Sequence, residues 1–101
     1  MTIAPGIEFP EAEIAAVCRR YRVKELAIFG SAARGELRPD SDFDLLVEFL
    51  PEAKVDLVDH FAAESEFAGI LGRKVDLVSK RALRRTLREE VLSDARTIYA
   101  A

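Results

Sequence analysis

The spacing of apolar and polar residues changes along this chain, and the changes predict alternating helices and strands. Over residues 10–22 the apolar side chains recur at helical spacing, which predicts a first helix. Residues 23–29 are apolar and end at Gly30, and residues 43–49 are almost continuously apolar and end before Pro51. Short apolar runs bounded in this way are typical of strands, and the second indicates a strand partly covered on both faces. The apolar positions of the predicted first helix are Ile14, Val17, Cys18 and Tyr21.

The second half of the chain predicts two further helices and a third strand. Residues 55–71 form an apolar helical pattern that Gly72 ends, and residues 81–92 form another. Residues 74–78 alternate as a strand does, and residues 97–99 predict a last short strand. The apolar residues that predict the first of these two helices are Leu57, Val58, Phe61, Phe67, Ile70 and Leu71.

The connecting segments are short. Residues 1–9 are expected to be extended, residues 31–35 to form one helical turn, and residues 36–41 to form a loop. The resulting order of helix, strand, strand, helix, strand, helix and a final strand indicates an α/β (α+β) chain without internal repeats.

Composition fits one globular domain over residues 1–101, because half of the residues are hydrophobic and a third are charged. No apolar run approaches the ~20 residues of a membrane helix, and residues 1–10 lack the charged and apolar regions of a signal peptide. Cys18 is the single cysteine, so no internal disulfide forms. We therefore expect a cytoplasmic protein that does not associate with a membrane.

Charge is distributed unevenly, although the formal net charge is only −3. Residues 73–88 hold seven basic residues and a single acid, Asp76, whereas residues 48–66 are acidic, with Lys54 as their one basic residue. A charge run by itself usually belongs to a solvated helix face. An aspartate inside a basic segment raises the expectation of a site that meets phosphate or an acidic partner surface.

Gly30 and Ser31 follow the first predicted strand and open a run of small residues that ends at Gly35. Glycine permits close approach of the backbone, and N–H groups at the start of a helical turn bind phosphate. We therefore expect Gly30 and Ser31 to bind the phosphates of a nucleotide. Arg34 either joins them or pairs with an acid in the following loop. The alternative, a plain glycine turn with a serine cap, is common in α/β proteins.

Asp42 and Asp44 stand two residues apart on the second predicted strand, so their side chains share one face. Two such carboxylates repel each other unless a cation lies between them, and Mg²⁺ prefers oxygen ligands. If the third predicted strand is a neighbour, Asp76 joins the pair, and three carboxylates can hold two metal ions. The alternative, a solvated Asp-x-Asp turn, is disfavoured because apolar residues surround these aspartates.

Other motifs that share these residues are excluded. Glu36 and Leu37 stand where a P-loop requires Lys and Ser or Thr. Leu45 and Pro51 stand where an EF-hand loop requires glycine and a bidentate glutamate. His60 stands alone on a predicted helix and is expected to be a partly exposed surface residue without a partner for nucleophilic catalysis.

Gly30-Ser31 followed by Asp42-x-Asp44 resembles the signature of the polymerase-beta-like nucleotidyltransferases. The fuller strings Phe29–Gly35 and Ser41–Val47 resemble the minimal nucleotidyltransferase branch, including its MntA-type antitoxins. The resemblance covers about residues 21–99 and implies a small mixed sheet with helices packed against it.

The resemblance also implies a role for each site residue. Gly30 and Ser31 would form the triphosphate-binding turn, and Asp42 and Asp44 would be metal ligands. Asp76 would be the third carboxylate, acting as a metal ligand and as the base toward the acceptor hydroxyl.

The implied reaction is Mg²⁺-dependent transfer of AMP from ATP to a tyrosine of a HEPN-domain partner encoded nearby, which silences a toxin. The small size of the chain favours an acceptor surface supplied by another protein, hence a hetero-oligomer. Two alternatives stay open. One is a non-catalytic antitoxin that occludes its partner, and the other is transfer to a small molecule such as an aminoglycoside. Nucleic acid is disfavoured as a direct ligand because the net charge is negative, and a homodimer through an edge strand stays open.

Overall fold

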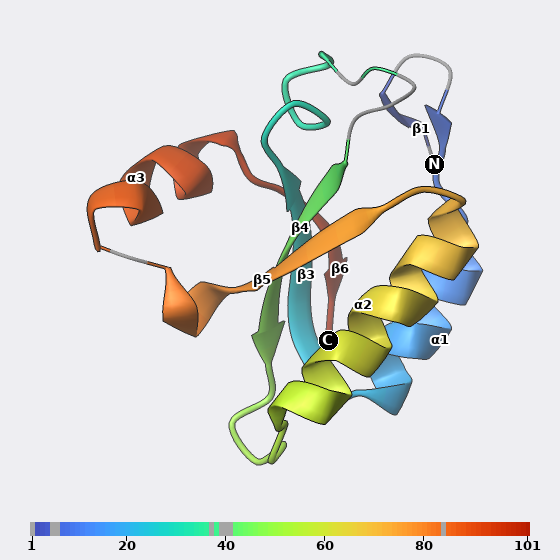
Figure 1. Ribbon diagram of the computed structural model, residues 1–101, viewed down its shortest axis with the longest axis vertical. Helices are drawn as coiled ribbons and strands as arrows, with labels where there is room; N and C mark the ends of the chain where they lie inside the picture. Colours follow the sequence, from blue (N-terminus) through green and yellow to red (C-terminus); the bar gives the residue numbers. More distant parts are fainter. Residues whose placement is uncertain (1, 5–6, 37, 39–41, 84) are drawn as a thin grey trace.

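A four-stranded sheet forms the centre of the computed structural model (Figure 1). Its strands are β3 (Val23–Phe29), β4 (Phe43–Phe49), β5 (Val75–Ser79) and β6 (Arg96–Ala100), in the spatial order β5-β4-β3-β6. The structure describes residues 2–4, 7–36, 38, 42–83 and 85–101. Part of the loop predicted over residues 36–41 therefore lies outside the described residues.

The sheet is mixed, as the resemblance implied. β4 pairs antiparallel with β3 and parallel with β5, while β6 pairs antiparallel with β3. The carboxyl end of β3 and the amino ends of β4 and β5 therefore lie at the same end of the sheet. Phe29 is the register partner of Asp44, and Asp44 is the register partner of Asp76. Residues far apart in sequence thus meet at one end of the sheet.

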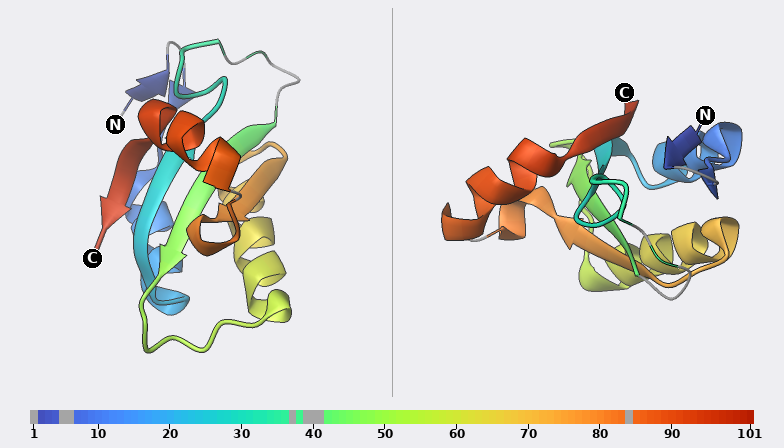
Figure 2. Two further views of the ribbon diagram at one scale, coloured as in Figure 1. Left: turned by 90° about the vertical axis from the view of Figure 1, so that its left-hand side faces the viewer. Right: turned by 90° about the horizontal axis from the view of Figure 1, so that it is seen from above.

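Two helices, α1 (Glu11–Arg20) and α2 (Leu57–Leu71), cover one face of the sheet, and α3 (Arg85–Asp94) lies on the other side (Figure 2). Alternate strand residues such as Phe43, Leu45 and Val47 point toward the two helices and are almost completely buried. The helices contribute Ile14, Val17, Cys18, Ala63 and Phe67 to the same core. None of the helices in the described part of the chain is long and apolar enough to span a membrane.

Local capping explains where the two packed helices begin and end. The side chain of Asp56 accepts a hydrogen bond from the backbone N–H of Asp59 at 2.8 Å, and the backbone N–H of Asp56 donates to Oδ2 of Asp59 at 3.4 Å, which forms a capping box at the start of α2. Gly72 adopts φ 66° and ends the helix, as predicted. α1 ends before the predicted residue 22 because Arg22 adopts φ 56°, which is not helical.

Three segments differ from the sequence-based expectation. The predicted extended lead-in contains a small antiparallel pair, β1 (Thr2–Ala4) with β2 (Ile7–Glu8). The third helix begins later than predicted, because the chain first makes a short 3₁₀ turn, η1 (Lys80–Ala82). β6 is longer than predicted, because its pairing with β3 extends the ladder in both directions.

Three apolar residues of α2 do not reach the core. Leu57, Val58 and Phe61 are 74%, 75% and 58% exposed, although their helical spacing alone would be expected to bury them. α2 is apolar around most of its circumference, so the pattern does not specify which side packs. The side carrying Ala63 and Phe67 meets the sheet, and the three exposed residues lie on the opposite side of the helix.

We predict that Phe67→Ala lowers the free energy of unfolding by about 3–5 kcal/mol, because it empties a fully buried site. Phe61→Ala, on the exposed side of the same helix, is expected to change it by less than about 0.5 kcal/mol. Urea unfolding followed by circular dichroism measures both. Equal losses would show that Phe61 packs in the core.

Candidate active site

The turn that follows β3 carries the first group of site residues. The N–H groups of Arg34, Gly35 and Glu36 donate to the carbonyls of Gly30, Ala32 and Ser31, which closes the predicted helical turn. Ala32 is buried and anchors the turn to the core. Among the described residues none accepts a hydrogen bond from the N–H groups of Ser31, Ala32 or Ala33. These N–H groups at the start of the turn are therefore available to an anion.

Gly30 is required for two independent reasons. Its φ is +70°, a conformation that residues with a Cβ rarely adopt. A Cβ at this position would also lie only 2.5 Å from Oδ2 of Asp44 and 3.4 Å from its Cγ. The carboxylate of Asp44 therefore lies directly against the backbone of the turn. This contact joins two predicted parts of the site, the phosphate-binding turn and the first strand carboxylate.

Asp76 lies beside Asp44 because β4 and β5 pair in parallel with these two residues in register. Register partners on neighbouring strands point to the same face, so the predicted adjacency of the two carboxylates is confirmed. Asp42 precedes β4 by one residue and lies on the alternation that carries Asp44. Its carboxylate is half exposed and lies 3.8 Å from Nζ of Lys74.

The carboxylate of Asp44 is influenced by its burial and by the two other aspartates. Burial raises the pKa of Asp44, and the negative charges of Asp76 and Asp42 raise it further, while Arg34 lowers it. Within the described part of the chain, no three acidic, histidine or cysteine side chains form a group that could hold a metal ion, so the predicted cluster of Asp42, Asp44 and Asp76 is not formed and only Asp44 and Asp76 are register partners. A metal held by these aspartates therefore needs further oxygen ligands, which Mg²⁺ commonly takes from substrate phosphates.

Arg34 is paired with two acids. Its Nη1 donates to Oδ2 of Asp94 at 2.9 Å, and its Nε donates to Glu36 at 3.3 Å. These two hydrogen bonds raise the pKa of Arg34, and the bond to Asp94 has the larger effect. The pairing with Glu36 is the loop contact that the sequence allowed. Asp94 was not found from sequence, because an acid that ends a helix 60 residues away carries no local signal.

His60 and Cys18 take no part in this site. His60 is half-buried, as expected, and its Nε2 lies 2.7 Å from the carbonyl oxygen of Leu77, so it links α2 to β5. Cys18 is fully buried in the core, and burial raises the pKa of its thiol to about 12. A thiol that stays protonated near neutral pH is a poor nucleophile, which leaves the aspartates and the turn as the reactive groups.

A mixed sheet, a glycine turn whose N–H groups are available to an anion and neighbouring aspartates are the features predicted for a phosphate-transferring enzyme. The chain matches the nucleotidyltransferase domain family over residues 13–99 and belongs to that family. It is accordingly an enzyme of the nucleotidyltransferase type.

Individual relatives place the chain more narrowly. It is 39% identical over 75 residues to the protein adenylyltransferase MntA of Thermococcus cleftensis, and the match covers 74% of each chain. A solved structure of a candidate minimal nucleotidyltransferase is 42% identical, with a TM-score of 0.73, covering 85% of this chain and 86% of that one. A crystal structure of a toxin–antitoxin with AMP-PNP has a TM-score of 0.75 at 23% identity, covering 92% of this chain and 75% of that one, and shows that the fold is shared.

The contact between Gly30 and Asp44 yields a prediction with a matched control. Gly30→Ala and Gly35→Ala both place a Cβ at positive φ, but only the first meets Asp44, since nothing lies within 4 Å of a Cβ at Gly35. We expect Gly35→Ala to cost about 1 kcal/mol of stability and Gly30→Ala distinctly more. Thermal unfolding measures the difference, and adding Asp44→Ala to Gly30→Ala should recover part of it. Equal losses for the two single variants would contradict the contact.

The raised pKa of Asp44 predicts that this carboxylate lowers stability at neutral pH. A raised pKa in the folded state means that the contribution of Asp44 to stability is present at low pH and is lost as the pH rises through that pKa. Asp44→Asn should therefore unfold at a higher urea concentration than wild type at pH 7 in a chelating buffer. The gain should vanish below about pH 3. Glu13→Gln, an exposed charge removal on α1, serves as the control and should show no such gain.

Proposed function

We propose that this chain transfers AMP from ATP to a tyrosine hydroxyl of a HEPN-domain partner, in a reaction that depends on Mg²⁺, and thereby acts as an antitoxin. The observation that carries the proposal is the contact of Asp44 with Gly30, with Asp76 in register beside it. It brings a phosphate-binding turn and two carboxylates to one end of the sheet. The MntA relative and the toxin–antitoxin structure support the choice of donor and partner.

The residues suit Mg²⁺ in their chemistry. Asp42, Asp44 and Asp76 offer oxygen atoms only. Burial, and then the charges of Asp76 and Asp42, raise the pKa of Asp44, and a bound cation would favour its charged form. We assign these three aspartates to metal binding, with two ions expected. When bound, Mg²⁺ would neutralise the phosphates and lower the pKa of the attacking hydroxyl.

The residues of the chain have separate parts in the transfer. The free N–H groups of the turn, with the hydroxyl of Ser31, bind the β- and γ-phosphates, and Arg34 adds a positive charge beside them. The acceptor oxygen forms a bond to the α-phosphorus, the bond from this phosphorus to the bridging oxygen breaks, and pyrophosphate leaves. Asp76 takes the proton of the hydroxyl.

The test is transfer of α-labelled ATP, with Mg²⁺, to the HEPN-domain protein encoded beside the chain. We expect a labelled partner with wild type and a loss of at least about 100-fold with Asp42→Asn, because a proposed ligand of the metal that neutralises the reacting phosphates is removed. Glu13→Gln should transfer at the wild-type rate, since its exposed carboxylate lies on α1, outside the site.

Other outcomes separate the alternatives. The partner could form a stable complex without becoming labelled, and Asp42→Asn could neutralise it as well as wild type does. Both results together would show that the chain acts by occluding its partner and not by transfer. Label that appears on an added aminoglycoside and not on the partner would assign a small-molecule acceptor instead.

A further inference from the structure

Three large apolar side chains lie together on the solvent side of α2, at the start of the helix. We call Leu57, Val58 and Phe61 the α2 patch. Among the described residues Leu92 on α3 is the one other large apolar side chain that is exposed, and at 40% it is less exposed than any of the three. Contiguous exposed apolar side chains of this kind generally mark an interaction site, whereas single ones need no explanation.

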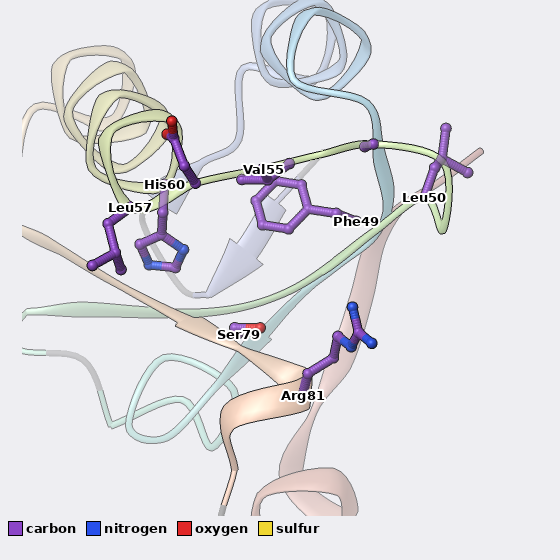
Figure 3. Close-up of a pocket in the computed structure, with 9 residues that line it drawn as sticks. Phe49, Leu50, Val55, Leu57, His60, Ser79 and Arg81 are labelled. Atoms are coloured by element: carbon purple, nitrogen blue, oxygen red, sulfur yellow. The ribbon is translucent and has the colours of Figure 1, made fainter.

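A pocket of about 360 Å³ adjoins the patch. It lies between the loop after β4, the first turns of α2 and the end of β5, and Leu57 belongs to both the pocket and the patch. Figure 3 shows Phe49 and His60 lining the pocket on one side, with Arg81 across from them. A concave hollow lined by both apolar and polar residues, beside an exposed apolar strip, is suited to one anchoring side chain of a protein partner.

The charged residues around the α2 patch indicate which kind of surface binds it. Asp56 is exposed and lines the pocket, and the acids Glu52 and Asp59 lie within four residues of it in the sequence, against the basic residues Lys54 and Arg81. Acids of this kind would repel an anionic membrane or a nucleic acid. A second copy placed face to face would oppose the same acids, which is unfavourable. The surface that fits is an apolar protein face rimmed by Lys or Arg.

The patch lies far from the carboxylates, at the other end of β4. The strand runs from Asp44 at the site to Phe49 at the pocket, five residues or about 17 Å along the sheet. A partner bound there leaves the aspartates and the turn open. A typical interface of about 800 Å² per partner is wide enough to span this distance and to bring an acceptor side chain to the site.

We propose that the α2 patch and its pocket are the docking surface for the acceptor protein, which binds through an apolar surface with a basic rim. This inference rests on the proposed function for the identity of the acceptor, a HEPN-domain protein. Partner binding and nucleotidyl transfer then take place at opposite ends of β4, so a substitution can abolish one without abolishing the other.

Isothermal titration of the HEPN-domain protein encoded beside the chain tests the surface. Phe61→Ser and Val58→Ser should each weaken binding about tenfold or more, and Leu92→Ser should bind as wild type does, because it removes an exposed apolar group elsewhere. Glu52→Lys, which reverses a rim charge, should also weaken binding. Circular dichroism should confirm that the variants stay folded, as their exposure implies. Binding of Phe61→Ser within twofold of wild type would overturn the proposal.

Two further measurements separate docking from chemistry. In the labelled transfer assay Phe61→Ser should raise the KM for the partner about tenfold with kcat unchanged, whereas Asp42→Asn should bind the partner normally and fail to transfer. A complex that is sensitive to Phe61→Ser but never labelled would support docking and reject transfer. Light scattering of the chain alone tests whether the α2 patch instead binds a second copy. A dimer that Phe61→Ser dissociates would make a second copy the occupant and overturn the proposal.

Discussion

The close contact between the carboxylate of Asp44 and the backbone of Gly30 is the constraint around which the site is arranged. It holds a strand residue and a turn residue so close that a Cβ at Gly30 would lie 2.5 Å from the carboxylate oxygen. The turn must therefore contain glycine, and its left-handed φ directs the chain into a short hydrogen-bonded turn in which the first N–H groups have no acceptor among the described residues. Moving either partner would separate the turn from the carboxylates.

This contact is held in place by the sheet and its core. The antiparallel pairing of β3 with β4 places Phe29 opposite Asp44, and the parallel pairing of β4 with β5 adds Asp76. Phe43 and Leu45, on either side of Asp44 in the strand, are fully buried beneath α1 and α2. The acids are thus supported by packed side chains on the opposite face of the sheet. Burial, and then the charges of Asp76 and Asp42, raise the pKa of Asp44, and the packed core fixes the backbone that holds this carboxylate in place.

α2 has a different role on each of its two sides. Ala63 and Phe67 close the core, and His60 ties the helix to the carbonyl oxygen of Leu77 on β5. Tyr21 and Arg20 at the end of α1 bind Glu66 on α2, which fixes the two helices relative to each other. The helix is therefore a rigid element whose outer apolar residues are presented to solvent in a defined arrangement. A rigid apolar surface loses little conformational freedom on binding, which favours its use as an interface.

The local sequence determined the elements and the chemical types of the site. Short apolar runs that end in glycine or proline specified β3 and β4, and Gly72 specified the end of α2, whereas its start after Asp56 falls two residues later than predicted. The spacing of Asp42 and Asp44 and the small residues after Gly30 specified carboxylates and a turn, because these signals act within a few residues.

Tertiary structure decided the rest. Strand order brought Asp76 to Asp44, and a helix end brought Asp94 to Arg34, contacts between distant residues that no local pattern encodes. Tertiary packing also determines which side of α2 is buried. The sequence pattern does not specify that side, because both sides of the helix carry apolar residues.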